Sequence, residues 1–496
     1  MQRHLALIAG AGAGKTAFMI TMIALLKKTQ SAFVIDPKGQ IAKVLVRAMR
    51  RLGRAVHVLD PMNITPFAAA CWNYLDEIAV INARLGEDMT TLFLEKVAQA
   101  DIPKSGKENP FFADSGRIIW AAILAYVYLI YPPEQRNPIT ARRLLMEGLA
   151  EHAEPGEDGL MLLWLAMKHE PRLGGFISKA GNMFATMDER TRSTVLATAR
   201  TGTKYLDHAQ VQRVVQSSTF NVTDLKGGSD FVFLVAPTTE IRGTLSPWFR
   251  VMTMTTLWVF EQIPGGLKDP TLFAIDELPA LGHIEDLQMA APVMRGYGIR
   301  LLLIAQDLEA LKRVYPEGWG GLLGNAECVY FMGVGHRGTA EYLSSELGKA
   351  LRIEKMGRGE RATKQRNERE LLTTDQVMRL LAPRRNNMII LRFGERPIRA
   401  KQMPYYKYLP VTLHDPDPEH GERPARTWLR SVLKLNVEQA PAPRPAHELS
   451  AADARAIFGL PAGFTTDDLR TRAQFLEGRF APEIIRAARA TLEGLL

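Results

Sequence analysis

The stretch Ala9-Gly10-Ala11-Gly12-Ala13-Gly14-Lys15-Thr16 decides the fold, because it joins a short apolar segment, residues 5–9, to a segment with helical periodicity, residues 15–27. It matches the phosphate-binding loop GxxxxGK(S/T) except that Ala9 replaces the first glycine. Small residues let successive backbone N–H groups curl around a phosphate, the lysine reaches the terminal phosphates, and the hydroxyl is a ligand for Mg²⁺. The predicted nucleotide-binding residues are Gly10, Ala11, Gly12, Ala13, Gly14, Lys15, Thr16 and Ala17.

These glycines have two other interpretations. Gly10 and Gly12 also begin the dinucleotide fingerprint GxGxxG, but that motif requires a small residue where Lys15 stands. The second alternative is a tight glycine-rich turn that binds no ligand. The position between a strand and a helix favours the phosphate loop over both.

Strand and helix patterns alternate over the first 76 residues. Apolar strands are predicted at residues 5–9, 33–35 and 55–59, with helices at 15–27 and 41–52 between them. This order predicts a parallel sheet wrapped by helices, in which ligands bind at the carboxyl ends of the strands.

Helical periodicity replaces the strand pattern between about residues 75 and 205, and strands resume at 230–235, 272–275, 301–304, 328–332 and 388–391. We therefore expect an α/β fold with a mostly parallel sheet, an inserted all-alpha domain and a small helical C-terminal tail. The predicted domains are a nucleotide-binding domain from residues 1–76 and 206–410, the all-alpha domain at 77–205, a linker at 411–446 that includes three prolines between 441 and 445, and a helical module at 447–496.

Composition excludes several protein classes. The chain has 496 residues, of which 46% are hydrophobic, so it is not disordered. Its two cysteines, Cys71 and Cys328, exclude a disulfide scaffold and a zinc protein. The net charge of +9 favours an anionic partner, although ordinary solubility also explains it. The apolar run at residues 118–131 is shorter than the roughly 20 residues that span a bilayer, so we expect a buried helix and no membrane span in this chain.

Asp276 and Glu277 follow an apolar strand, residues 272–275. In a phosphate-loop protein, the aspartate would belong to the Mg²⁺ shell and the glutamate would polarise water for attack on the γ-phosphate, which favours hydrolysis over kinase chemistry. A strand-ending cap is the alternative for such a pair taken alone. The phosphate loop elsewhere in the chain favours the site.

Gln306 follows the apolar strand at residues 301–305 and is a candidate to sense the γ-phosphate or position water, or else a surface glutamine that caps the next helix. Arg295 and Arg300 flank a glycine-rich turn. Either is a candidate arginine finger for a neighbouring subunit or a solvated loop cation. The segment Asp36-Pro37-Lys38-Gly39 is expected to form a type I or II turn.

Taken together, these residues resemble the type IV secretion coupling protein family, hexameric ATPases that bring DNA or protein substrates to a conjugation or secretion channel. The matching stretches keep the family's order over about residues 5–408: the phosphate loop, FVIDPKG at 33–39, WNYLD at 72–76, AIDELPALG at 274–282, RGYG at 295–298, IAQD at 304–307, and residues 371–377 with 398–406.

The resemblance implies a RecA-like P-loop ATPase that uses ATP and Mg²⁺. By position, Thr16 and Asp276 would bind the metal, Glu277 and Gln306 would act in catalysis, and Arg295 would act in trans. The implied partners are a homohexamer, DNA bound with a relaxase, and channel components, with the all-alpha domain receiving substrate. Members usually carry a membrane anchor before the first strand, so we expect a cytoplasmic protein peripheral to the inner membrane, with an anchor outside this chain or on a partner.

The polar segment at residues 352–369 is the best candidate DNA contact, as a loop without apolar periodicity, and a solvated loop is its alternative. Its candidate cations are Arg358, Arg361, Lys364, Arg366 and Arg369. The tail resembles the first helices of a J-domain, but Ala481-Pro482-Glu483 stands where such domains have His-Pro-Asp, so a docking module is expected. The alternative functions are a soluble DNA translocase and an adaptor that binds nucleotide only to assemble.

Overall fold

A computed structural model describes residues 4–103, 109–263, 269–282, 293–356 and 363–418 of the chain. The chain divides into two compact units, Met1–Leu429 and Arg430–Leu496. All described residues lie in the first unit, so the predicted helical module at 447–496 falls outside them.

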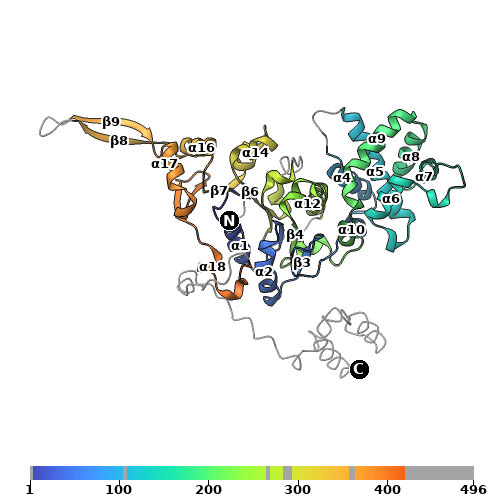
Figure 1. The fold of residues 1–496 in the computed structure, drawn as a ribbon, viewed down its shortest axis with the longest axis horizontal. Helices are drawn as coiled ribbons and strands as arrows, with labels where there is room; N and C mark the ends of the chain where they lie inside the picture. Colours follow the sequence, from blue (N-terminus) through green and yellow to red (C-terminus); the bar gives the residue numbers. More distant parts are fainter. Residues whose placement is uncertain (1–3, 104–108, 264–268, 283–292, 357–362, 419–496) are drawn as a thin grey trace, which may run out of the picture. The chain divides into compact units, whose positions relative to one another are not determined.

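The first unit is built on a sheet of nine strands in the order β11-β10-β7-β1-β6-β5-β2-β4-β3 (Figure 1). The seven strands from β7 to β3 run parallel, and β10 is antiparallel to both of its neighbours. The bounds are β1 (His4–Ala9), β2 (Ala32–Pro37), β3 (Val56–Leu59), β4 (Phe231–Ala236), β5 (Thr271–Ile275), β6 (Ile299–Ala305), β7 (Ala326–Met332), β10 (Asn387–Arg392) and β11 (Ile398–Lys401). The predicted α/β class with a mostly parallel sheet is confirmed.

Helices cover both faces of the sheet, which explains why its central strands are apolar along their whole length. One face packs on α1 (Lys15–Ala24) and α2 (Gln40–Arg51), whose buried residues form one core with β1, β2 and β4. The opposite face packs on α12 (Ser246–Gln262), α14 (Leu308–Val314), α15 (Trp319–Gly324) and α16 (Arg337–Leu347). The phosphate-loop stretch thus ends a fully buried strand and begins a helix, as its sequence predicts.

A block of helices lies in the chain between β3 and β4. Its bounds are η1 (Tyr74–Asp76), α3 (Glu77–Leu85), α4 (Met89–Asp101), α5 (Pro110–Ile130), α6 (Pro138–Glu147), α7 (Gly159–Lys168), α8 (Phe176–Thr186), α9 (Glu189–Gly202), η5 (Lys204–Asp207) and α10 (Ala209–Val215). Its core is continuous with that of α12, because α4 packs against α12. The predicted boundaries at residues 77 and 205 stay predictions.

The helix α5 is longer than its apolar run indicated. It begins at Pro110, behind an Asn109 cap, and extends over 21 residues. Among the described residues it is the one helix long and apolar enough to cross a membrane, and 67% of its apolar window is buried inside the protein. A buried core helix passes the same length test, so length and hydropathy here are weak grounds for a span.

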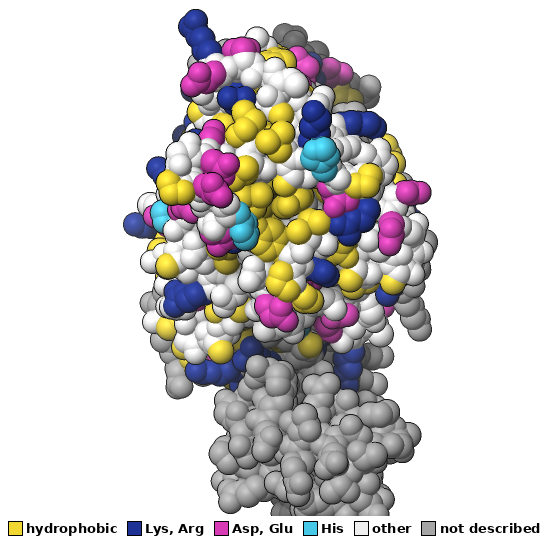
Figure 2. All heavy atoms as spheres, turned by 90° about the vertical axis from the view of Figure 1, so that its right-hand side faces the viewer, with side chains coloured by type: hydrophobic (Ala, Val, Ile, Leu, Met, Phe, Trp, Pro, Cys, Tyr) yellow, Lys and Arg dark blue, Asp and Glu magenta, His cyan; other side chains and the backbone are white. Residues whose placement is uncertain are grey.

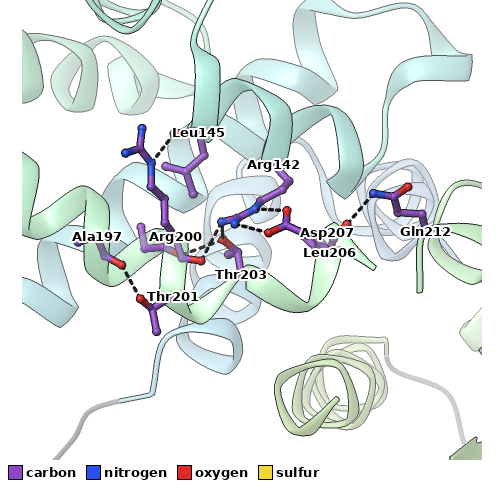
Figure 3. A network of polar contacts seen from close by, with 10 residues as sticks. Arg142, Leu145, Ala197, Arg200, Thr201, Thr203, Leu206, Asp207 and Gln212 are labelled. Carbon is purple, nitrogen blue, oxygen red and sulfur yellow. Dashed lines mark hydrogen bonds and ion pairs between the residues drawn. The ribbon is translucent and has the colours of Figure 1, made fainter. Parts of the chain in front are cut away.

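A buried arginine ties three parts of the helical block together (Figure 3). Arg142 of α6 donates two hydrogen bonds to the Asp207 carboxylate, at 2.8 and 2.7 Å. It also donates to the Arg200 carbonyl and to the Thr203 hydroxyl, each at 2.8 Å. These bonds hold the pKa of Asp207 below its usual value. The bidentate geometry joins α6 to the end of α9 and to η5.

Two polar segments differ from their predictions. The expected loop at residues 352–369 instead contributes to an antiparallel hairpin of β8 (Lys349–Met356) and β9 (Thr363–Glu370), which forms a separate two-stranded sheet (Figure 1). The backbone of a two-stranded ribbon pairs with itself, so it needs no apolar period of the kind on which the prediction relied. The strand β11 was also not predicted.

The expected linker does not begin at residue 411. After α17 (Thr374–Leu380), α18 (Tyr405–Tyr408) and η11 (Val411–Leu413), the chain lies along α2. Asp415 pairs with Arg51 at 2.7 Å, and Asp417 accepts hydrogen bonds from Gln40 and Tyr405. These contacts, which charge composition alone did not indicate, fix the chain to Asp417. The rest of the predicted linker lies outside the described residues.

Candidate nucleotide-binding site

The phosphate-loop stretch curls at the carboxyl end of β1. Gly12 and Gly14 adopt positive φ angles of 67° and 88°, which glycine accepts at little cost. The helix α1 begins at Lys15, directly after Gly14. Backbone N–H groups at a helix start are an anion-binding arrangement, so the loop is suited to a phosphate.

A second loop packs closely against this stretch. The Gly10 N–H donates to the Met332 carbonyl at 3.2 Å, at the end of β7. A Cβ on Gly10 would lie 2.2 Å from the Gly333 carbonyl oxygen, and a Cβ on Gly333 would lie 2.3 Å from the Cβ of Ala13. Both positions therefore require glycine. The missing first glycine of the motif is harmless, since Ala9 is the last, buried residue of β1.

The lysine of the loop contacts the predicted water-activating glutamate. Lys15 Nζ lies 3.2 Å from Glu277 Oε2, and Arg242 Nη2 lies 3.4 Å from Glu277 Oε1. Arg242 ends α11 (Thr238–Arg242), the short helix that follows β4. Residues from three parts of the chain thus meet at the carboxyl edge of the sheet.

Asp276 has the environment of a cation ligand. Its Oδ1 atom is buried and has no hydrogen-bond partner among the described residues. Burial raises the pKa of Asp276 to about 6, against the opposing effect of Lys15. A buried, unpartnered carboxylate oxygen fits a hard divalent cation such as Mg²⁺. Thr16, in the first turn of α1, would supply the hydroxyl.

The described residues contain no group of three or more His, Cys, Asp or Glu side chains that could hold a metal ion by themselves. A Mg²⁺ ion keeps several waters and binds through one or two carboxylates plus substrate phosphates. The residues present therefore fit a magnesium ion that arrives with a nucleotide.

Asp36 to Gly39 form a β-turn next to this site. The Gly39 N–H donates to the Asp36 carbonyl at 3.2 Å, and Lys38, the third residue of the turn after Pro37, has φ 83°, so the expected turn is present and is of type II. A Cβ on Gly39 would lie 2.7 Å from Thr65 Cγ2. The Asp36 carboxylate accepts the Ala42 N–H at 2.7 Å, and burial raises its pKa to about 8. Asp36 thus orders the start of α2.

Gln306 and Arg295 lie at opposite ends of β6. Gln306 follows the carboxyl end, between the ends of β1 and β5, and its side chain is exposed. Arg295 precedes the amino end, in η8 (Arg295–Tyr297), and is also exposed. Seven strand residues separate the two edges by about 23 Å. Within one chain, Arg295 is therefore far from the phosphate loop, whereas Arg300 lies half-buried within β6.

Three of the five candidate DNA-contacting residues lie in β9, and the other two lie outside the described residues. Arg358 and Arg361 lie outside the described residues. Lys364 and Arg366 belong to β9, where their backbones pair with Lys355 and Ile353. Arg369 is exposed near the end of the same strand, opposite Ala350.

Two residues at the site were missed from the sequence. Arg242 stands at the end of α11, beyond the end of β4, and a single arginine in a polar segment carries no motif. Gly333 follows β7 in the same way that Gly10 follows β1. Noting the residue after each predicted strand would have found Gly333, since strand ends share one edge of a parallel sheet.

A groove opens in the helical block, and hydrophobic side chains gather at the centre of the face that this block presents in Figure 2. The groove has a volume of about 360 Å³ and lies between α4, α5 and α8. Its lining residues are mostly apolar: Thr91, Ile118, Leu173, Gly174, Phe176, Lys179, Ala180 and Met183. Ile118 is 42% exposed there.

Solved structures share this fold. The bacterial conjugative coupling protein TrwBdeltaN70, in an unbound monoclinic form, matches with a TM-score of 0.60 at 17% identity, over 81% of this chain and 85% of that chain. The plasmid coupling protein TrwB in complex with ADP and Mg²⁺ matches with a TM-score of 0.59 at 16% identity, over 81% and 86%. At such identities the likeness shows the fold alone, and it confirms the RecA-like P-loop architecture.

Curated relatives are similar over most of this chain. The conjugal transfer protein TraG of Rhizobium radiobacter is 25% identical over 82% of this chain and 62% of its own length. The type IV secretion system-coupling protein VirD4 of Bartonella henselae is 25% identical over 82% and 63%. The chain thus spans somewhat less than two thirds of these relatives. A family model described as type IV secretory system conjugative DNA transfer matches residues 1–427, and the chain belongs to this family.

Proposed function

We propose that the protein is an ATP-hydrolysing coupling protein that recruits DNA or nucleoprotein and translocates it to a type IV secretion channel. The observation that carries the proposal is the meeting of Lys15, Asp276 and Glu277 at one sheet edge, in a chain of this family. The adaptor alternative, which binds nucleotide without hydrolysing it, has no use for a water-activating carboxylate such as Glu277.

In the proposed reaction, the phosphate loop and Lys15 hold the terminal phosphates of ATP. Glu277 accepts a proton from water, whose oxygen bonds to the γ-phosphorus as the bond to the β-phosphate oxygen breaks, which releases ADP and phosphate. Mg²⁺, held through Thr16 and Asp276, would neutralise charge on the phosphate oxygens. Gln306 would orient the water from the neighbouring strand end.

Arg295 would complete the site of an adjacent subunit. Because it lies at the sheet edge opposite its own phosphate loop, it reaches a nucleotide only across an interface. The proposed assembly is a homohexamer, in which each site takes residues from two chains.

The substrate-facing parts are assigned in the same way. We place DNA contacts on the β8–β9 hairpin and relaxase docking on the helical block, whose groove would take an apolar segment. We place the protein in the cytoplasm, at the inner membrane, through channel components or a membrane-anchored partner. The domain division at residues 77 and 205 is part of this proposal.

Mutation of the two charged partners tests the proposal. Lys15→Ala should abolish Mg²⁺-dependent ATP hydrolysis and weaken nucleotide binding. Glu277→Gln should lower turnover by on the order of 10² or more yet keep nucleotide binding, because the carboxylate acts on water. Lys28→Ala, an exposed lysine just beyond α1, is the matched control and should change neither quantity.

The outcome separates the candidate functions. Full turnover in Glu277→Gln would remove that residue from the mechanism. A wild-type protein that binds ATP but does not hydrolyse it would favour the adaptor. Hydrolysis with DNA movement but without relaxase or channel binding would favour the soluble translocase.

A further inference from the structure

The Glu277 carboxylate is shared between two cations. Its side chain is 12% exposed, and its two oxygens are divided between Lys15 of α1 and Arg242 of α11. Lys15 is 19% exposed, whereas Arg242 is 57% exposed. A residue as exposed as Arg242 adds little to folding stability through an ion pair. Its position therefore calls for a reason other than stability.

The two cations do not stay equivalent once a nucleotide binds. Lys15 is the residue that reaches the terminal phosphates in a phosphate loop, so a bound nucleotide competes with Glu277 for it. When Lys15 turns to the phosphates, Arg242 is the cation that remains on Glu277.

The backbone around Glu277 places Arg242 beside the carboxylate. Glu277 has φ 62° and ψ 56°, a left-handed conformation that is strained for a non-glycine residue. It stands between the end of β5 and the short helix η7 (Leu278–Leu281). The helix α11 packs against η7, which keeps the start of the Arg242 side chain at a fixed place beside the carboxylate.

We propose that Arg242 is a positioning residue for ATP hydrolysis: it holds the Glu277 carboxylate in place for the attacking water after Lys15 has moved to the nucleotide. Arg242 touches neither the water nor the phosphates in this role and acts only through Glu277. The inference rests on the proposed ATPase function.

The test compares Arg242→Ala, Arg242→Lys and Thr239→Ala by steady-state hydrolysis of Mg²⁺-ATP and by binding of a fluorescent ATP analogue. Arg242→Ala should lower kcat roughly tenfold, part of the 10²–10⁴ that a general base contributes. The Kd for the analogue should change less than about twofold, since binding precedes the role of Glu277. Arg242→Lys should recover most of the lost kcat. Thr239, exposed on the same short helix, should tolerate alanine with no change.

A double-mutant cycle separates positioning from a general structural effect. In the Glu277→Gln background, single-turnover rates should be the same with and without Arg242→Ala, because Arg242 acts through the carboxylate that is already gone.

Three results would overturn the proposal: an unchanged kcat in Arg242→Ala, a loss confined to nucleotide affinity, or an equal loss in the Glu277→Gln background. A wild-type protein with no hydrolysis at all would overturn the proposed function instead, and this proposal with it.

Discussion

The carboxyl edge of the nine-stranded sheet and the β8–β9 hairpin are both rich in positively charged residues, but they differ in how these residues are held. At the sheet edge, Lys15 and Arg242 are each paired with a carboxylate more than 30 positions away in the sequence. In the hairpin, strand pairs with strand, and no other strand joins this sheet among the described residues.

This difference in packing suits the sheet edge to catalysis and the hairpin to nucleic-acid contact. A buried sheet fixes a few atoms within a few tenths of an ångström, which catalysis requires. A two-stranded ribbon has no core of its own and holds its cations less closely, which is sufficient for phosphates of any sequence. We therefore expect substitutions at the sheet edge to change turnover, and substitutions in the hairpin to change affinity and its salt dependence.

Outside the phosphate loop and the carboxylate pair, the largest effect is expected for Arg295→Ala. If Arg295 completes the site of an adjacent subunit, turnover should fall by on the order of 10³ while nucleotide binding stays intact. Mixing this variant with Lys15→Ala should restore some turnover, because an interface between the two variants can hold one intact site. Unchanged rates would return Arg295 to the solvated-cation interpretation, and the sheet edge would then be complete within one chain.

Gly333→Ala tests how tightly the sheet edge is packed. The new Cβ would lie 2.3 Å from the Ala13 Cβ and would force the phosphate loop to move. Overpacking and a positive φ of 53° together cost about 1–3 kcal/mol, so nucleotide affinity should fall about tenfold or more. Calorimetry measures the affinity of each variant for the nucleotide. The control is Gly335→Ala, because a Cβ on Gly335 would meet nothing within 4 Å. Equal affinities in the two variants would show that the loop is more pliable than the packing indicates.

Replacing Lys364, Arg366 and Arg369 by alanine tests the hairpin. Each duplex phosphate contact contributes about −0.9 to the slope of log affinity against log salt concentration. The slope should therefore become less steep by the contribution of up to three contacts. Basal ATP hydrolysis should not change. Arg190→Ala, an exposed cation of the helical block, should leave the slope unaltered. A slope as steep as that of the wild type would place the DNA contact elsewhere.

The smallest effect is on stability and leaves activity intact. Asp101 of α4 is fully buried and accepts a hydrogen bond from Trp120 at 2.6 Å. Burial raises its pKa from 3.8 to about 7. Between these values the folded state keeps a proton that the unfolded state has lost. The stability from this group is thus complete below pH 4 and declines up to about pH 7, by at most about 1.4 kcal/mol per pH unit.

Urea unfolding at pH 5, 6 and 7 measures the pH dependence of stability that Asp101 causes. The wild-type free energy of unfolding should fall with pH relative to that of Asp101→Asn, which has no proton to lose. Glu134→Gln, an exposed carboxylate, should follow the wild type. A constant difference between wild type and Asp101→Asn would mean that the carboxyl is ionised throughout.

Short-range patterns predicted much of the fold and part of the site. The phosphate loop and the Asp276-Glu277 pair were readable because each is a run of neighbouring residues at the end of an apolar strand. The bounds of β1, β2 and β5 were right to within two residues for the same reason. The hairpin is not readable from the sequence because pairing across a two-stranded ribbon requires no apolar alternation. The first two turns of α5 are not readable because Asp114, Ser115 and Arg117 interrupt the apolar pattern ahead of Ile118.

The sequence by itself determined that strands and helices alternate, that the first strand ends in a phosphate loop, and that a carboxylate pair ends another strand, since all of these depend on residues close together in the chain. Only the tertiary structure decided that Lys15 and Arg242 share Glu277, that Gly333 must leave room for Ala13, and that Arg295 lies at the opposite edge from its own loop. Strand order in the sheet decides each of these, and it is set by packing between segments hundreds of residues apart.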